Sequence, residues 1–178
     1  KTSLLIFKAG KGAKRAVPLS LVSRLEDFDV QDIEISDDKK VIQYRGKLMP
    51  LIPFSANMVI KEKGTQPVLV FSERDKNLGL MVDEIVDIVE ECVDVQISSE
   101  GHKGLLGSAI IEGEAMDVID VGYFVSQAYS NEWYGKTQAY NKLGRGDDGR
   151  TVLLIDDSPF FLNMLTPILG AAGYNVIS

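Results

Sequence analysis

Short apolar stretches recur at close spacing along most of the chain, and turn residues separate them. In residues 93–97, Val and Ile alternate with Asp and Gln, which is the period of a strand with one buried face. Dipeptides such as Arg45-Gly46 between the stretches are typical of turns. Nine short strands with little helix between them predict a barrel-type all-β unit. The nine stretches are residues 4–7, 41–44, 48–52, 68–71, 78–82, 85–89, 93–97, 109–111 and 116–121.

Two short helices are expected within this region, over residues 17–25 and 121–128. After residue 128 the pattern is lost, because residues 130–150 contain four glycines, scattered charge and no sustained period. We therefore expect a domain at 1–130, a linker at 131–150 and a further element at 151–178.

The pattern changes again in the last segment. Residues 152–155 form a continuous apolar run, which is typical of a strand buried on both faces of a parallel sheet. Ser158 can cap a helix whose first residue is Pro159 and which ends near Gly173, and residues 174–177 begin a second strand. This is one β-α-β unit of an α/β domain. The chain lacks an initiator Met and stops within an apolar run, so we expect it to be a piece of a longer protein.

Composition narrows the function classes. The 45% hydrophobic and 25% charged residues are ordinary for a globular protein, and 178 residues accommodate one domain and a remnant. A net charge of −7 argues against a nucleic-acid partner, because proteins that bind nucleic acids usually carry a basic surface. The single cysteine cannot form an internal disulfide, and no apolar run reaches the roughly 18 residues of a membrane helix. These features predict a cytoplasmic protein without direct membrane insertion.

Charge is unevenly distributed. The first 25 residues contain six basic residues and no acidic one, whereas acidic residues crowd into 26–38 and 83–94. Two interpretations stay open: these are solvated faces, or they are complementary docking patches.

Few residues are candidates for catalysis or metal binding. Asp156 and Asp157 follow the apolar strand of the last segment, where two adjacent carboxylates could hold Mg²⁺, or could simply cap a helix. His102 is expected in an exposed loop, and Cys92 is expected to be structural because neighbouring carboxylates disfavour a thiolate. The glycines of Gly101-x-x-Gly104-x-x-Gly107 are expected in turns rather than in a phosphate loop. No catalytic residues are identified.

Several segments carry a family resemblance over nearly the whole chain. Residues 15–26 resemble the opening of the CheW-like regulatory domain of chemotaxis histidine kinases, and residues 43–51, with Tyr44-Arg45-Gly46, are similar to its Y-R-G-x-L-P-L segment. Residues 78–85 resemble its G-L-x-V-D-x-I strand, and residues 107–121 resemble its closing hairpin. Residues 151–178 look like the start of a response-regulator receiver, with Asp156 and Asp157 as its acidic pair.

The resemblance implies a mainly β fold of two intertwined SH3-like barrels, followed by a linker and one β-α-β unit of a truncated flavodoxin-like receiver. It implies a hybrid kinase of the CheA type, whose CheW-like domain docks the kinase onto the CheW adaptor and the cytoplasmic tips of chemoreceptors. Function in these residues would be docking rather than chemistry. The partner-binding residues expected are Leu105 and Leu106, which follow Gly104 and either point outward or begin a core strand.

The resemblance also implies what this piece lacks. The phosphoacceptor Asp of a receiver, and its later Thr or Ser and Lys, would lie beyond Ser178, so the Mg²⁺ site of Asp156 and Asp157 would be incomplete. The ATP-binding domain and the phosphorylated His domain of the kinase are absent, so we expect no cofactor here. Two alternatives stay open. The chain could belong to a CheV-like coupling protein, or to a Mg²⁺-dependent phosphoryl-transfer enzyme of the haloacid-dehalogenase type, although the latter requires D-x-D and the chain has D-D.

Overall fold

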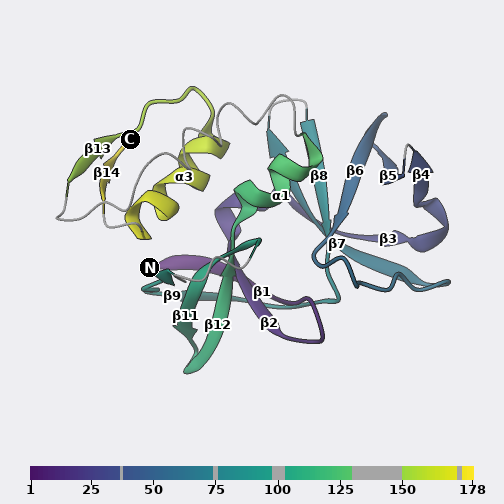
Figure 1. Cartoon of the computed structure of the whole chain (residues 1–178), viewed down its shortest axis with the longest axis horizontal. Coiled ribbons are helices and arrows are strands. Elements are labelled where there is room, and N and C mark those ends of the chain that lie inside the picture. Colours follow the sequence, from purple (N-terminus) through teal and green to yellow (C-terminus); the bar gives the residue numbers. More distant parts are fainter. Residues whose placement is uncertain (37, 74–75, 98–102, 130–149, 172–173) are drawn as a thin grey trace. The chain divides into compact units, whose positions relative to one another are not determined.

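The computed structural model describes residues 1–36, 38–73, 76–97, 103–129, 150–171 and 174–178 (Figure 1). The fold is mainly β, as the sequence predicts, with two β-sheets of six strands and few helices among these residues. The chain divides into two compact units, Thr2–Glu90 and Glu91–Ser178, with Lys1 belonging to the second. The predicted linker at 131–150 lies almost wholly outside the described residues.

A six-stranded sheet in the unit Thr2–Glu90 has the strand order β3-β7-β8-β6-β5-β4. Neighbouring strands are antiparallel except for β6 and β8, which are parallel. One face carries an apolar core that includes Ile42, Met49 and Val68. The strands are β3 (Arg24–Asp29), β4 (Glu34–Ser36), β5 (Lys39–Tyr44), β6 (Lys47–Pro53), β7 (Thr65–Glu73) and β8 (Lys76–Met81).

Three further strands of this unit lie side by side: β2 (Lys14–Pro18), β1 (Thr2–Lys8) and β9 (Glu84–Glu91). β1 and β2 form an antiparallel hairpin. The four consecutive residues from Leu4 to Phe7 are all buried, so β1 is covered on both faces. At its far end, Asp83 N–H donates to the Lys8 carbonyl oxygen (2.8 Å), which joins the start of β9 to the end of β1.

The unit Glu91–Ser178 contains three antiparallel neighbours, β10 (Gln96–Ile97), β11 (Leu105–Ile111) and β12 (Glu114–Ile119). The tight turn between β11 and β12 places Glu112 and Gly113 at positive φ (50° and 78°), as a hairpin with this twist requires. Helix α1 (Val121–Ala128) follows β12. Its predicted bounds, 121–128, are confirmed.

The helix predicted over residues 17–25 is wrong. β2 continues to Pro18, a single 3₁₀ turn covers Leu19–Leu21, and β3 starts at Arg24. Pro18 has ψ of 123°, so the backbone enters this turn in an extended conformation. The β-branched Val17 and the missing N–H of Pro18 both act against a helix here.

The strand predicted over 93–97 is reduced to Gln96–Ile97, and residues 92–95 form a loop. Conversely, β2, β3 and β4 were not among the predicted strands. β3 and β4 consist mostly of charged or exposed residues, so their apolar pattern is weak. Their pairing with β7 and β5 determines their conformation instead.

A β-α-β unit occupies the C-terminal residues, as expected. β13 (Thr151–Leu153) and β14 (Asn175–Ile177) are parallel, and α3 (Pro159–Ala171) connects them and contacts β14. Ser158 caps the helix, because its Oγ accepts a hydrogen bond from Phe161 N–H (3.3 Å). The apolar run 152–155 is not buried on both faces here, since Leu153 and Ile155 are 64% and 82% exposed. The reason is that this sheet has only two strands.

No helix among the described residues is long and apolar enough to cross a membrane.

Candidate functional site

Leu105 and Leu106, the predicted partner-binding residues, are the first two residues of β11. Both side chains are half-buried, and Leu105 lies opposite Ile119 in the register with β12. The sequence left two possibilities for this pair, an outward-pointing turn or the start of a strand, and the structure shows the start of a strand. Each side chain keeps an exposed part, which leaves the pair available for contact with a partner.

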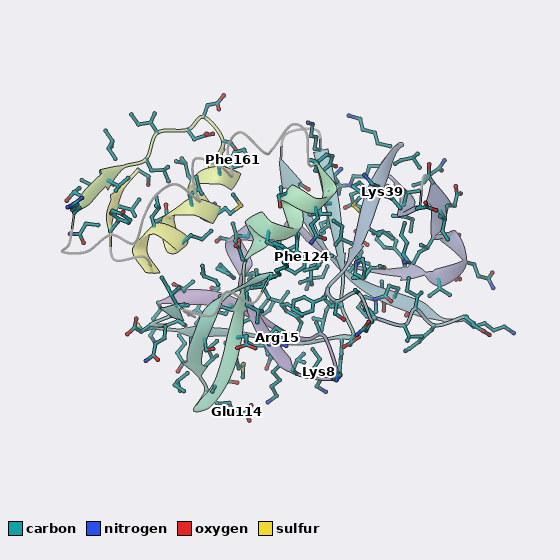
Figure 2. The ribbon with its side chains drawn as sticks, in the orientation of Figure 1. Lys8, Arg15, Lys39, Glu114, Phe124 and Phe161 are labelled. Atoms are coloured by element: carbon teal, nitrogen blue, oxygen red, sulfur yellow. The ribbon has the colours of Figure 1, made fainter. Side chains whose placement is uncertain are left out.

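Gly104 positions the start of β11. It has φ of 84°, and its carbonyl oxygen accepts a hydrogen bond from Asp120 N–H (3.0 Å). A Cβ at this position would lie 2.8 Å from Cζ of Phe124, a residue of α1 that is labelled in Figure 2. The glycine thus lets α1 pack closely on the turn that leads into Leu105.

Gly107 has a different role from the predicted turn. It lies inside β11, next to a register irregularity between Leu105 and Gly107. A Cβ on Gly107 would overlap the backbone carbonyl of Gln96 in β10. Close approach of two strands, rather than a turn, therefore requires this glycine. Gly101 and His102 lie outside the described residues.

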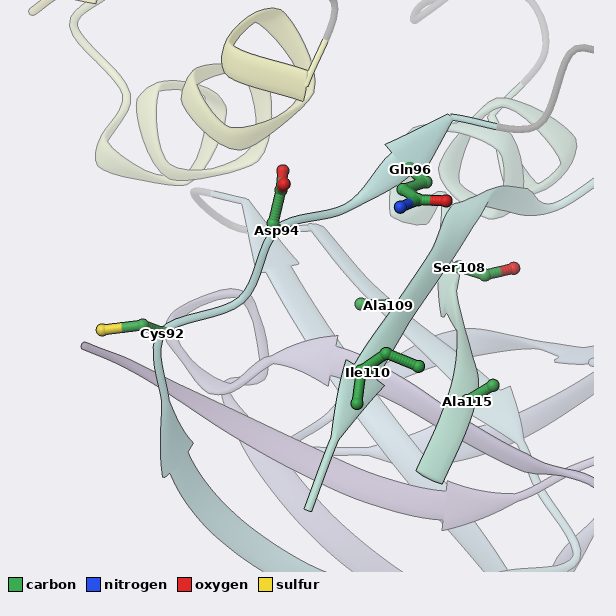
Figure 3. A pocket seen from close by; sticks show the side chains of 7 residues that line it. All are labelled: Cys92, Asp94, Gln96, Ser108, Ala109, Ile110 and Ala115. Carbon is green, nitrogen blue, oxygen red and sulfur yellow. The ribbon is translucent and has the colours of Figure 1, made fainter. Parts of the chain in front are cut away.

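An open pocket of about 380 Å³ lies beside these strands (Figure 3). Its lining combines the apolar side chain of Ile110, which is 63% exposed, with the polar groups of Gln96 and Ser108. Ser108 Oγ donates a hydrogen bond to Asp117 Oδ1 (3.0 Å). Such a surface suits an apolar side chain flanked by hydrogen-bonding groups. The lining residues are Cys92, Asp94, Gln96, Ser108, Ala109, Ile110 and Ala115.

The sequence reasoning did not single out the residues that line this pocket, apart from Cys92. A signal was present, because the three apolar residues 109–111 interrupt the alternation of β11. Ala109 and Ile111 are buried, so Ile110 points to the opposite, exposed face. Cys92, expected to be structural, is an exposed free thiol in the loop after β9.

Asp120 connects β12 to α1. It is the N-cap residue of the helix, and its Oδ1 accepts a hydrogen bond from Tyr123 N–H (3.3 Å). Burial raises the pKa of the Asp120 carboxyl, and backbone hydrogen bonds from Tyr123 and Gly122 oppose the shift. Desolvation dominates, so the charged form is disfavoured in the folded chain.

We expect the Asp120 carboxyl to make stability fall as pH rises. Its folded pKa lies above the ordinary aspartate value of 3.8, so its stabilising contribution is complete below that value and is lost as pH rises through the folded pKa. Asp120→Asn keeps a capping acceptor but does not titrate. Urea unfolding at a series of pH values should show the variant gaining stability relative to the parent chain as pH increases. Parallel pH profiles for the two proteins would contradict this assignment.

Asp156 and Asp157 lie between β13 and α3. Asp156 Oδ1 accepts a hydrogen bond from Ser158 N–H (2.9 Å), which is the geometry of a residue that shapes the helix start. The described residues contain no group of three His, Cys, Asp or Glu side chains able to hold a metal ion. The Mg²⁺ site predicted at these two carboxylates stays a prediction.

In a comparison with protein families, residues 3–128 match the family model of the CheW-like domain. The chain belongs to the CheW-like domain family. This match spans the all-β region, including β11, the pocket and α1. The comparison with curated proteins finds no match.

The fold is also similar to a solved structure, the scaffolding protein TtCheW from Thermoanaerobacter tengcongensis. The TM-score is 0.56 at 12% sequence identity, and the match covers 67% of this chain and 84% of TtCheW. At this identity the likeness concerns the fold alone.

The Tyr44-Arg45-Gly46 segment forms the turn between β5 and β6 of this CheW-like domain. Arg45 and Gly46 both have positive φ (51° and 77°). The Arg45 guanidinium lies 5.4 Å from the centre of the Tyr44 ring, and Tyr44 Oη donates a long hydrogen bond to Glu26 Oε1 (3.5 Å). The segment therefore has a structural role in joining β3, β5 and the turn.

Proposed function

We propose that this chain is a chemotaxis scaffold that docks a histidine kinase of the CheA type onto a CheW-type adaptor and the cytoplasmic tips of chemoreceptors. The match of residues 3–128 to the CheW-like domain is the observation that carries the proposal. In this role the domain regulates kinase activity by binding. Its location would be the cytoplasm, at membrane-associated receptor arrays.

We further propose that residues 151–178 begin a receiver, as the β-α-β unit and its two strand-end carboxylates suggest. Asp156 and Asp157 would supply part of a Mg²⁺ site, and the phosphoacceptor and remaining ligands would belong to residues outside this chain. ATP would bind only in a separate kinase domain. A CheV-like coupling protein would share this arrangement, but it would lack the ATP-binding domain of a kinase.

The docking proposal is tested at Leu105 and Leu106. We expect the double variant Leu105→Asp/Leu106→Asp to weaken adaptor binding by about 2 kcal/mol or more, since buried charge at an interface hot spot is costly. Isothermal titration of the full chain with a CheW-type adaptor measures this. Because both leucines are half-buried, Leu105→Ala/Leu106→Ala provides a milder second variant, and the thermal transition of each variant reports its folding.

The matched control carries the same charge change elsewhere. Ile35→Asp/Val59→Asp alters two exposed apolar residues of the unit Thr2–Glu90 and should leave adaptor affinity unchanged. Unchanged affinity in both folded leucine variants would remove these residues from the binding surface. Failure of the parent chain to bind either an adaptor or receptor tips would reject the scaffold function itself.

A further inference from the structure

β9 presents an apolar stripe to solvent. Residues 84, 86, 88 and 90 lie on one face of the strand, since side chains alternate. Within this face, Val86 and Ile88 are 42% and 48% exposed, and Glu84 and Glu90 flank them. The opposite face holds the buried Val89. The exposed pair Val86 and Ile88 departs from a usual strand, whose solvent-facing side chains are polar.

Among the strands that the structure describes, β9 is also the last of its sheet, with β1 beside it on one side. Ile88 N–H donates a hydrogen bond to Asp87 Oδ1 (2.7 Å), a side-chain acceptor next to it in the strand. A backbone donor at a sheet edge can pair with an added strand when a better acceptor arrives. An extended segment could therefore align with this edge and place alternate side chains on Val86 and Ile88.

The charge of the segment indicates what the added strand contains. Residues 83–94 include six acidic residues and no basic one. Glu84 already forms an ion pair with Lys8 Nζ (2.7 Å), which shows that a cation is accepted at this end of β9. Charge complementarity thus favours Lys or Arg side chains next to apolar ones.

A second copy of this chain does not fit the same edge. Antiparallel pairing of two β9 strands about Asp87 would place Glu84 of one copy opposite Glu90 of the other, at both ends. Like charges directly opposite each other destabilise a strand pair.

We propose that β9 is a docking edge for an extended segment of a partner protein in which every second side chain, on one face, follows the order cation, apolar, apolar, cation. The segment adds a strand beside β9, covers Val86 and Ile88, and pairs its cations with Glu84 and Glu90. This surface is separate from Leu105 and Leu106, and the inference does not depend on the proposed scaffold function.

The test uses the full chain and a fluorescein-labelled peptide, Lys-Thr-Val-Thr-Val-Thr-Lys, with blocked ends, whose Lys and Val side chains lie on one face of the extended peptide. We expect saturable binding by fluorescence anisotropy and loss of at least tenfold in affinity for Val86→Thr/Ile88→Thr, which keeps β-branched side chains in the strand. A peptide N-methylated at alternate amides should bind at least tenfold more weakly, because it cannot form the backbone ladder.

Charge specificity is tested with two variants of equal net charge. Glu84→Gln/Glu90→Gln should weaken peptide binding, whereas Asp27→Asn/Asp29→Asn, which removes two exposed charges from β3, should not. Equal weakening by both pairs would reduce the interaction to non-specific attraction and overturn the proposal. No binding, or binding unaffected by Val86→Thr/Ile88→Thr or by N-methylation, would also overturn it.

Discussion

Replacing Phe7 by alanine is expected to lower the free energy of unfolding by about 3–5 kcal/mol, because the substitution removes a large buried ring and leaves a cavity. Phe7 is fully buried in β1. Its ring packs edge-to-face on Phe54 with centroids 6.3 Å apart, and the Arg15 guanidinium lies 5.5 Å from the centre of the Phe54 ring. Arg15 is partly held by its Nε, which donates to the Ala9 carbonyl oxygen (3.4 Å). One substitution therefore loosens the hairpin and the loop after β6.

Urea unfolding followed by circular dichroism measures this loss. The control is Ile35→Ala, which truncates an apolar side chain that is 75% exposed in the same unit and should change stability by no more than about 0.5 kcal/mol. A loss below about 1 kcal/mol for Phe7→Ala would show that the ring is not part of the cooperative core.

Gly104→Ala is expected to cost about 2–5 kcal/mol, and Gly113→Ala only about 1–2 kcal/mol. Both glycines have positive φ (84° and 78°), so both substitutions carry the strain of a left-handed alanine, about 1–2 kcal/mol. At Gly113 the added Cβ meets nothing within 4 Å. At Gly104 it also presses on Phe124, and such overpacking costs typically about 1–3 kcal/mol.

The difference between the two free energies of unfolding isolates the contact between α1 and the turn before β11. Equal losses would mean that Phe124 moves aside without cost. If the contact positions Leu105 as the structure indicates, folded Gly104→Ala should also bind the adaptor more weakly than folded Gly113→Ala. Adaptor titration with the same two proteins measures this.

Local features were predictable where the decisive interactions lie close together in the chain. Ser158 and Pro159 begin α3 because a hydroxyl cap and a preset φ act on the next turn of backbone. Helix α1 has its predicted bounds for a similar reason, with Asp120 as its N-cap. Apolar strands such as β7 and β8 were recognised because burial of their own side chains decides their position.

Other features depend on partners far away in the chain. β3 is mostly charged, and it is a strand because β7 pairs with it along its whole length. Gly107 looked like a turn residue, yet it is needed because the backbone of β10 passes over it. Neither neighbour is visible in the local pattern, so local propensity led to the wrong expectation.

The sequence by itself determined the mainly β class, the β-α-β unit, the bounds of α1, the cap of α3, and the family segments that the match over residues 3–128 supports. These follow from apolar periodicity and short-range hydrogen bonds, which act within a few residues. Only the tertiary structure decided that Leu105 begins a strand, that Ile110 opens into a pocket, and that Val86 and Ile88 remain exposed on an edge strand. The exposure of a side chain depends on which strands, distant in sequence, pack over it. This packing is decided by the whole folded chain and not by any one segment.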